Sequence, residues 1–384
     1  MRILQIGKFY PIRGGVEKVM WDLTEGLSLR GYSCDMLCAM LRKSKVDKDH
    51  EFHAQKTSEG TVIHLGDKGR VICVPARAKL AATMISPAMI GWMRKHAAEY
   101  DIVHIHHPDP MAALALFLSG YKGRVILHWH SDILTRRILL MFYFPLQSWL
   151  IRRADRIVGT TPIYIRDSRY LQQVQQKTLC IPIGIYPIVY DEKAARQIRD
   201  RYPDKKIVFS LGRLVPYKGF TSLVQAAEYL PDDYIVLLGG EGPLKKDLAQ
   251  MIEKLGLQEK VKLLGFVSNT DLPAYYGACD VFAMCSRWKT EAFGIVLIEA
   301  MSCGKPVVAT VIPHSGVPWV NEDGVSGLNV PIENSASLAV GIMEICTNPR
   351  LYEAFSKRAR ERYEAYFSIQ DMIEKTIELY ENEL

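Results

Sequence analysis

Short apolar runs alternate with longer amphipathic stretches along most of the chain. The first run, residues 3–7, precedes a stretch at 16–29 whose apolar residues recur at helical spacing. Further apolar runs follow at 102–106, 125–130 and 156–160. Strands of this kind alternating with helices indicate parallel βαβ units, whose sheet is covered on both faces. The first half of the chain therefore predicts a Rossmann-like domain.

The pattern restarts after a stretch at 180–187 that is rich in Pro and Gly and typical of an interdomain linker. We predict an α/β fold with two Rossmann-like parallel-sheet domains, at residues 1–183 and 184–365. We also expect a closing helix at 366–384 to pack back on the first domain. Two such domains without a Gly-x-Gly-x-x-Gly fingerprint imply a cleft between them. The apolar runs of the second half are at 207–211, 234–238, 261–264, 281–284, 307–310 and 327–330.

Composition excludes several classes of protein. The chain has 384 residues, 48% of them hydrophobic and 23% charged, as in soluble globular proteins of two ordinary domains. A net charge of +6 suits anionic small molecules or anionic lipid surfaces and does not demand nucleic acid. The eight cysteines show no C-x-x-C spacing, which indicates reduced thiols and no zinc site. We read the charged segment 42–60 as a flexible insertion.

The location expected from the sequence is cytoplasmic. The chain enters a strand at once, so we expect no signal peptide, and no run reaches the roughly 18–20 apolar residues of a membrane span. The segment 136–153 is nevertheless apolar between two Arg pairs, with Pro145 interrupting it. It fits either a peripheral contact with an anionic membrane surface or a core helix packed on the sheet.

The stretch 287–306 carries the clearest chemistry. It begins as a polar loop, turns helix-forming after Gly294 and stops at Gly304. Glu291 precedes the expected helix start, where free N–H groups favour an anion, and Gly294 lets a ligand approach the backbone. Glu299 lies about two turns on, or about 11 Å, which is long for a hydrolytic carboxylate pair. This spacing favours positioning of an anionic, hydroxyl-rich ligand.

Cations and glycines follow the expected strands. Arg213 and Lys218 come after the first strand of the second half, where open α/β sheets bind ligands, and two cations there can hold a diphosphate. The alternative is a pair of solvated loop cations. Gly14 and Gly15 join the first strand to the first helix, as in a phosphate-binding corner or an ordinary βα turn. Glu241 and Val267 follow later strands and suit either ligand contacts or turn and core packing.

Histidines follow two strands of the first half. His130 ends the apolar run 125–130 and can donate a hydrogen bond to a sugar hydroxyl, although a lone histidine is more often structural. His104 and His106, with His107 next to them, lie on one face by strand alternation, which is compatible with a metal. No carboxylate or thiol completes a ligand set, so we expect no metal.

With these residues in view, the chain resembles the GT4 family of retaining glycosyltransferases with the GT-B fold. The most specific element is Glu-x7-Glu, Glu291 to Glu299, followed by residues 300–309. The spacing before this element also matches the family, with Gly212-Arg213-Leu214 and Lys218-Gly219 at the expected distance along the sequence. The resemblance covers nearly the whole chain and implies two Rossmann-like domains facing each other across a deep cleft.

The resemblance also implies roles for the candidate residues. Arg213 and Lys218 would clamp the donor diphosphate, Glu291 would hold hydroxyls of the donor sugar, and Glu299 would bind the ribose. The amides of Phe293, Gly294 and Ile295 would meet the sugar or diphosphate, Gly15 would border the diphosphate, and His130 would touch the sugar near the reacting carbon. The leaving group would depart on the face that the acceptor attacks, its phosphate taking the acceptor proton, with no metal or cofactor.

Two departures from the family pattern bear on substrates. The family's Gly-Gly-x-Pro-Glu run is replaced by 313–321, which lacks the acidic residue, and 287–290 is unusually bulky and basic. The run Ser-Gly-Val-Pro-Trp-Val-Asn is similar to bacterial surface-polysaccharide enzymes, which implies a lipid-linked oligosaccharide acceptor.

The function expected from the resemblance is transfer of a hexose, mannose by preference, from a GDP- or UDP-sugar to a glycan or lipid-linked acceptor. The alternatives are a nucleotide-sugar epimerase, a phosphorylase, or a non-catalytic nucleotide-sugar-binding module. The intact set Arg213, Lys218, Glu291 and Glu299 argues against a non-catalytic module. Neither the nucleotide base nor the oligomeric state is fixed by the sequence.

Overall fold

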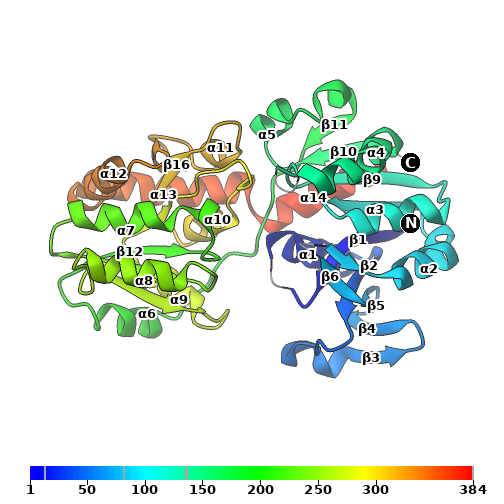
Figure 1. The fold of residues 1–384 in the computed structure, drawn as a ribbon, viewed down its shortest axis with the longest axis horizontal. Helices are drawn as coiled ribbons and strands as arrows, with labels where there is room; N and C mark the ends of the chain where they lie inside the picture. The colour runs from blue at the N-terminus through cyan, green and yellow to red at the C-terminus, as the bar shows by residue number, and fades with distance from the viewer. Residues whose placement is uncertain (13, 81–82, 135–136, 383–384) are drawn as a thin grey trace. The chain divides into compact units, whose positions relative to one another are not determined.

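A computed structural model describes residues 1–12, 14–80, 83–134 and 137–382 (Figure 1). The chain divides into two compact units. The N-terminal unit comprises Met1–Gly184 together with Ile369–Leu384, and the C-terminal unit comprises Ile185–Ser368. None of the described helices combines the length and the apolar character needed to cross a bilayer.

The N-terminal unit is built on a nine-stranded sheet in the order β11-β10-β9-β8-β1-β2-β5-β4-β3. Its strands pair in parallel except β3 with β4 and β4 with β5. The strand order reverses between β1 and β8. The strands are β1 (Arg2–Tyr10), β2 (Ser33–Leu41), β3 (Ala54–Thr57), β4 (Gly60–Leu65), β5 (Gly69–Ala76), β8 (Ile102–His107), β9 (Arg124–Trp129), β10 (Arg156–Gly159) and β11 (Thr178–Cys180), with a separate hairpin of β6 (Ala78–Leu80) and β7 (Thr83–Ile85).

The helices of this unit connect its strands, as the apolar periodicity predicts, except α14, which closes the chain. They are α1 (Gly15–Leu29), α2 (Pro87–His96), α3 (Pro110–Ser119), α4 (Arg137–Arg153), α5 (Pro162–Asp167) and α14 (Ile369–Glu381). Pro145 does not interrupt α4, which runs through it. The prediction of a flexible insertion at 42–60 was wrong, because this segment contains a 3-10 turn at Lys48–His53 and the β3–β4 hairpin.

The closing helix α14 lies beside α1 in the N-terminal unit (Figure 1). A Cβ placed on Gly26 of α1 would lie 2.1 Å from Cδ1 of Ile373, so only glycine permits this close approach. The hydroxyl of Tyr380 accepts a 3.0 Å hydrogen bond from Gln5 of β1 and lies 2.5 Å from Nδ1 of His104 on β8. The end of the chain is thus tied to the centre of the first sheet.

The C-terminal unit has a six-stranded parallel sheet in the order β14-β13-β12-β15-β16-β17. Its strands are β12 (Lys206–Leu211), β13 (Tyr234–Gly239), β14 (Val261–Gly265), β15 (Val281–Met284), β16 (Val307–Val311) and β17 (Gly327–Pro331). Its helices are α6 (Glu192–Arg199), α7 (Phe220–Tyr229), α8 (Lys245–Lys254), α9 (Leu272–Ala278), α10 (Ile295–Ser302), α11 (Val317–Val320), α12 (Ser335–Thr347) and α13 (Pro349–Tyr366). Both units are Rossmann-like, as predicted.

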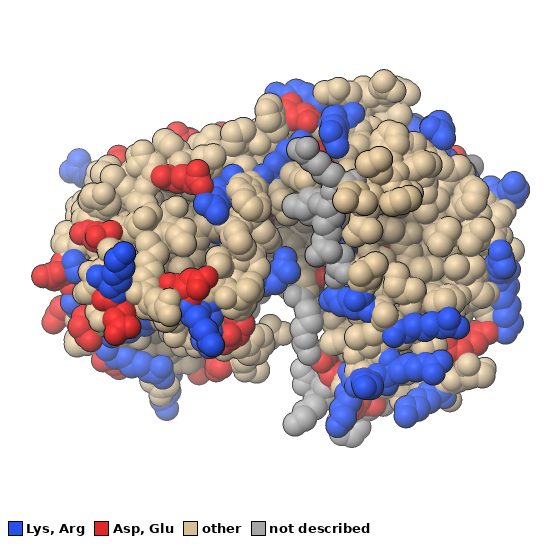
Figure 2. Space-filling view, viewed as in Figure 1, with Lys and Arg blue, Asp and Glu red and all other residues tan. Residues whose placement is uncertain are grey.

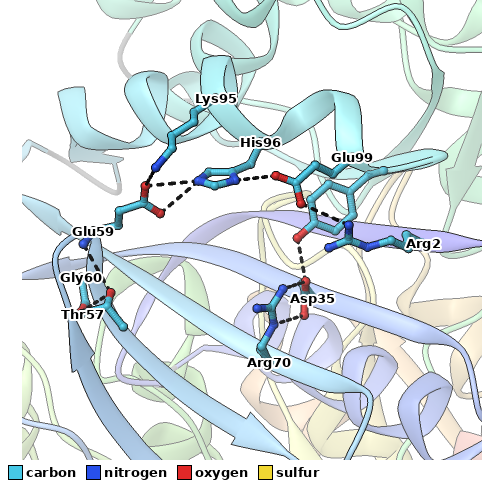
Figure 3. A network of polar contacts seen from close by, with 10 residues as sticks. Arg2, Asp35, Thr57, Glu59, Gly60, Arg70, Lys95, His96 and Glu99 are labelled. Carbon is cyan, nitrogen blue, oxygen red and sulfur yellow. Dashed lines mark hydrogen bonds and ion pairs between the residues drawn. The ribbon is translucent and has the colours of Figure 1, made fainter.

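An ion pair with a buried carboxylate joins two strands of the first sheet. Figure 3 shows Arg70 of β5 meeting Asp35 of β2 through two hydrogen bonds, of 3.0 and 2.5 Å. The Tyr100 hydroxyl donates a third, of 2.6 Å, and Asp35 is only 2% exposed. A buried carboxylate needs such partners, because its removal from water is otherwise costly.

Asp35→Asn is expected to destabilise the N-terminal unit by about 1–3 kcal/mol, because an amide replaces a buried carboxylate that accepts three hydrogen bonds, whereas the Arg70 side chain that loses its partner is 42% exposed and stays hydrated. For a domain of this size, such a loss lowers the melting temperature by roughly 2–12 °C. Differential scanning calorimetry measures it. The matched control is Asp67→Asn in the exposed β4–β5 turn, which should leave the melting temperature within about 1 °C of the parent. Equal melting temperatures for both variants would contradict the assigned role of the pair.

Candidate functional site

The strand order of the C-terminal sheet reverses between β12 and β15. In open α/β sheets, ligands bind beyond the carboxyl ends of the strands at such a reversal. The segment after β12 carries Arg213 and Lys218, and the segment after β15 carries Glu291. Gly219 has φ +67°, and a Cβ there would lie 2.0 Å from the carbonyl oxygen of Cys285, so glycine lets the two segments touch.

Lys218 and Glu291 form an ion pair at this reversal. The Lys218 Nζ atom lies 2.5 Å from Oε2 of Glu291, and each side chain is only 12% exposed. Burial alone would lower the pKa of Lys218, but the adjacent Glu291 carboxylate outweighs it and the pKa is raised. Lys218 therefore remains a cation at neutral pH. The pairing of these two predicted residues provides a fixed positive charge beside a fixed carboxylate.

Two serines hold the Glu291 segment in place. Ser286, which is fully buried, donates a 3.0 Å hydrogen bond to the same Oε2 atom, and Ser315 donates one of 2.5 Å to the Glu291 carbonyl oxygen. The backbone N–H of Gly316 donates to the carbonyl of Ala292 at 2.9 Å. The loop after β15 therefore holds the Glu291 carboxylate through Ser286, and the loop after β16 holds the backbone of Glu291 and Ala292.

Ser286→Ala is expected to lower kcat/KM for the reaction at this site about tenfold, because Glu291 would lose one hydrogen bond to its charged oxygen. The matched control is Ser210→Ala on β12, a buried serine that donates instead to the carbonyl of Ala283 at 2.7 Å. Both variants lose one buried hydroxyl, so their melting temperatures should fall alike. Steady-state kinetics measures kcat/KM for both variants. An equal fall in kcat/KM would contradict a positioning role for Ser286.

Helix α10 follows Glu291 and begins at Ile295, directly after Gly294, whose φ of +82° suits glycine. The N–H groups of Ile295 and Val296, the first two residues of the helix, precede any intrahelical acceptor, whereas Leu297 donates to the Gly294 carbonyl at 2.9 Å. Phe293 is buried, so only its backbone is available to a ligand. Further along α10, the Glu299 carboxylate accepts a 2.6 Å hydrogen bond from Tyr276 of α9. Tyr276 thereby orients Glu299.

The corners after β12, β13 and β14 lie against one another. A Cβ on Gly240 would lie 1.9 Å from the carbonyl oxygen of Gly212, so the first two corners meet backbone to backbone. Glu241 pairs with Lys245 at 2.7 Å, and both side chains are about half exposed. Val267 lies beside Gly239, because a Cβ added to Gly239 would be 2.9 Å from Cγ2 of Val267.

Arg213 is exposed, and its guanidinium lies 3.4 Å from the hydroxyl of Tyr217. It is close enough to Lys218 to oppose the protonation of that lysine.

Gly14 and Gly15 belong to the N-terminal unit, at the start of α1 and beside the strand reversal of that sheet. A Cβ placed on Gly14 would lie 2.3 Å from a carboxylate oxygen of Glu17, which is 5% exposed. A side chain at position 14 would therefore displace Glu17. The sequence pattern did not indicate this contact.

His130 also belongs to the N-terminal unit and is 5% exposed. Its Nε2 atom lies 2.9 Å from Nδ1 of His106, whose own Nε2 is 2.7 Å from Oε1 of Gln5. Burial, reinforced by repulsion from His128 and Lys8, holds the pKa of His130 well below its ordinary value. The imidazole is therefore neutral at pH 7. It can orient a hydroxyl through a hydrogen bond, but it is not a cation.

Four histidine rings from β8 and β9 form a stack. The ring centroids of His128 and His130 are 4.1 Å apart, and those of His104 and His106 are 4.8 Å apart, which confirms that the latter two share a face. One nitrogen from each of His104, His106 and His128 lies within 4.8 Å of the others. The planes of these three rings differ by 16–27°, and the nitrogens that are grouped this way belong to buried histidines.

Three contacts at the site were not anticipated from the sequence. These are Ser286 and Ser315 beside Glu291, and Tyr276 beside Glu299. The position of Ser286, two residues after the buried run 281–284, was a usable signal, since strand ends at a reversal carry ligand-binding groups. Nothing in the local sequence links Tyr276 to Glu299, because that contact depends on how α9 packs against α10.

Both halves of the chain match known glycosyltransferase families. The family described as Glycosyltransferase Family 4 matches residues 13–187, and the family described as Glycosyl transferases group 1 matches residues 191–362. The chain is 28% identical to O-antigen chain mannosyltransferase C of Escherichia coli, over 99% of this chain and 98% of that protein. It is 30% identical to D-rhamnosyltransferase WbpZ of Pseudomonas aeruginosa, over 96% of this chain and 92% of that protein.

Solved structures share the fold over the full length. Sucrose-phosphate synthase from Thermosynechococcus elongatus superposes with a TM-score of 0.80 at 23% identity, covering 99% of this chain and 98% of that one. The Anabaena protein HepE, solved in complex with UDP-glucose, superposes with a TM-score of 0.78 at 23% identity, covering both chains completely. At this identity the likeness concerns the fold, which is GT-B.

Proposed function

The chain belongs to the family 4 glycosyltransferases, and from this premise we propose that it transfers a hexose with retention of configuration from a nucleoside diphosphate sugar to a glycan or lipid-linked acceptor. The reaction would serve polysaccharide biosynthesis. The observation that carries the proposal is the Lys218–Glu291 pair at the strand reversal, with Arg213 close by. Such a pair can bind both parts of a nucleotide sugar: the cation suits the diphosphate, and the carboxylate suits the hydroxyls of the sugar.

In the proposed mechanism, Lys218 and Arg213 stabilise the charge that grows on the leaving diphosphate. Fixed cations in a partly water-excluded site act strongly on a charge that develops in the transition state. The first turn of α10 adds N–H donors and the positive end of its dipole. These groups supply what a divalent cation supplies elsewhere, so we propose that the reaction needs no metal and no cofactor.

Glu291 would hold the donor sugar while its bond to the diphosphate breaks. Its carboxylate is fixed by Lys218 and Ser286 on one oxygen, which leaves lone pairs of the other for sugar hydroxyls. The acceptor oxygen would attack the face that the diphosphate leaves, and a donor phosphate oxygen would take its proton. Glu299 would bind the ribose, with the amides of Gly294 and Ile295 at the phosphates and Glu241 and Val267 beside the nucleoside.

The donor sugar is proposed to have the manno configuration. Two relatives matched over nearly their full length are a mannosyltransferase and a D-rhamnosyltransferase by name, and D-rhamnose is the 6-deoxy form of D-mannose. One relative is an O-antigen enzyme by name, and another from Campylobacter jejuni acts by name on a diphospho-undecaprenol-linked saccharide. These names support a lipid-linked acceptor, reached from the inner face of the membrane.

A donor screen tests this proposal. Thermal melting with GDP, UDP and their hexose conjugates should show stabilisation by the nucleotide of one base, since binding to the native state raises the melting temperature. The stabilising donor should then transfer its sugar in the presence of EDTA. An α-linked product from an α-linked donor, identified by NMR, supports retention, whereas a β-linked product overturns it.

The same screen separates the alternatives. An epimerase would convert the nucleotide sugar without any acceptor, and a binding module would be stabilised without forming product. A phosphorylase would release a sugar phosphate from a glycan when given inorganic phosphate. Each of these outcomes would replace the proposed transfer.

Arg213→Ala is expected to weaken nucleoside diphosphate binding about 10- to 100-fold, the effect of losing one or two hydrogen bonds to a charged group. Isothermal titration calorimetry measures the change directly. Arg350→Ala on α13, another exposed arginine of the same unit, serves as control and should bind with parental affinity. Unchanged affinity in Arg213→Ala would remove Arg213 from the diphosphate site.

A further inference from the structure

The outer face of α4 exposes an unusual number of large apolar side chains. Ile138 and Met141 are each 73% exposed and Phe142 is 82% exposed. These three residues stand at i, i+3 and i+4, so they project from one face of the helix. Leu139 and Phe144 flank them and are 45% and 50% exposed. Water-soluble proteins rarely expose a contiguous apolar patch of this kind without a partner for it.

The opposite face of α4 is fully used by the fold. Tyr143, Gln147, Leu150 and Ile151 are buried against the rest of the N-terminal unit. The two expectations for 136–153 therefore apply to different faces of the same helix. The inner face packs in the core, and the outer face remains available.

The apolar patch extends onto the neighbouring helix. The rings of Phe117 on α3 and Trp149 on α4 meet edge to face with centroids 5.0 Å apart. Phe117 and Leu118 at the end of α3 are 48% and 36% exposed. The apolar surface thus spans two packed helices.

The surroundings of the patch are basic. Residues 133–154 contain four arginines and no Asp or Glu, and residues 1–184 carry 26 Lys and Arg against 15 Asp and Glu. Arg152 is exposed and falls on the same helical face as Met141, and Lys122 is exposed just beyond α3. Figure 2 shows uncharged side chains over α3 and α4 with Lys and Arg at the margins.

We propose that the outer face of α4, together with the end of α3, docks on an anionic phospholipid bilayer. Large apolar side chains would enter the boundary between headgroups and acyl chains, and Arg152 and Lys122 would meet the headgroup phosphates. Charge selects this occupant, because a basic rim around an apolar face complements an anionic membrane and would repel the same basic rim on a second copy. The inference rests on the proposed function, since a lipid-linked acceptor lies in such a membrane.

Co-sedimentation with vesicles tests the surface. The probes are vesicles of phosphatidylcholine alone and of phosphatidylcholine mixed with phosphatidylglycerol. The native protein should sediment with the mixed vesicles and much less with the neutral ones. The double variant Met141→Ser/Phe142→Ser should bind the vesicles at least about tenfold more weakly, since burying one large apolar side chain raises the affinity about tenfold or more. Arg152→Glu should weaken binding to the mixed vesicles alone.

The matched control replaces equally exposed apolar residues elsewhere. Leu29→Ser/Val189→Ser removes side chains that are 73% and 81% exposed and should sediment like the native protein. The proposal is overturned if the native protein stays in solution with both vesicles or if the two double variants bind alike. It is also overturned if light scattering shows a native dimer that Met141→Ser/Phe142→Ser converts to a monomer.

The outcome is separable from the proposed function. The Met141→Ser/Phe142→Ser variant should keep its stabilisation by nucleotide and its transfer to a water-soluble acceptor, and should slow only with acceptor embedded in vesicles. If the proposed transfer fails with every donor, vesicle binding still reports on the surface. If transfer succeeds while native vesicle binding fails, only the docking surface is refuted.

Discussion

Replacing Glu291 with glutamine is expected to lower kcat/KM for sugar transfer by about a hundredfold while the chain still folds, with a lower melting temperature because Lys218 loses its ion partner in a largely buried place. Glutamine keeps the size of the side chain but removes the charge that Lys218 and Ser286 hold in place. The donor sugar would then lose charge-assisted hydrogen bonds worth about 1.5–3 kcal/mol, and its orientation toward the acceptor would be less defined. Steady-state kinetics with the donor identified by the screen gives the ratio.

The control for this variant is Glu228→Gln on α7, an exposed carboxylate of the same unit. It should retain parental kinetics. Circular dichroism should show parental secondary structure for both variants. A Glu291→Gln enzyme with full activity would count decisively against the assigned site.

Lys218→Met is expected to have the largest effect on catalysis, a fall in kcat of about 10²–10³. Methionine preserves much of the side-chain volume but removes the cation that stabilises the departing diphosphate. The variant also leaves the carboxylate of Glu291 buried without its ion partner, which costs about 3–5 kcal/mol of stability. Its melting temperature should therefore fall as well.

A double variant separates these two effects. Lys218→Met/Glu291→Gln removes both charges, so it should recover much of the melting temperature that Lys218→Met loses, because no unpaired charge remains. Its transfer activity should stay as low as that of Lys218→Met. Recovery of activity together with stability would mean that Lys218 serves only the fold.

Much of the fold could be predicted from the sequence because parallel strands buried on both faces read as continuous apolar runs. The apolar pattern did not predict the β3–β4 hairpin. Most side chains of β3 face water, so its composition is that of a charged loop. The helix at α4 was anticipated, but not its continuation through Pro145, which depends on packing of the inner face.

The part of the site formed by residues that follow strand ends could be predicted. Lys218 and Glu291 are 73 residues apart, yet both follow strands that neighbour each other at the reversal, so their meeting could be expected. The histidine stack could be only half predicted. Alternation placed His104 and His106 on one face, but the pairing of β8 with β9 brings His128 and His130 to them. No local pattern encodes that register.

A crystal structure with the nucleoside diphosphate of the identified donor tests the central claim most directly. The claim predicts both phosphates beyond the carboxyl ends of β12 and β15, within hydrogen-bond distance of Arg213 and Lys218 and facing the first turn of α10. Density for the diphosphate at any other place, with Lys218 and Glu291 still paired and untouched by ligand, would contradict it.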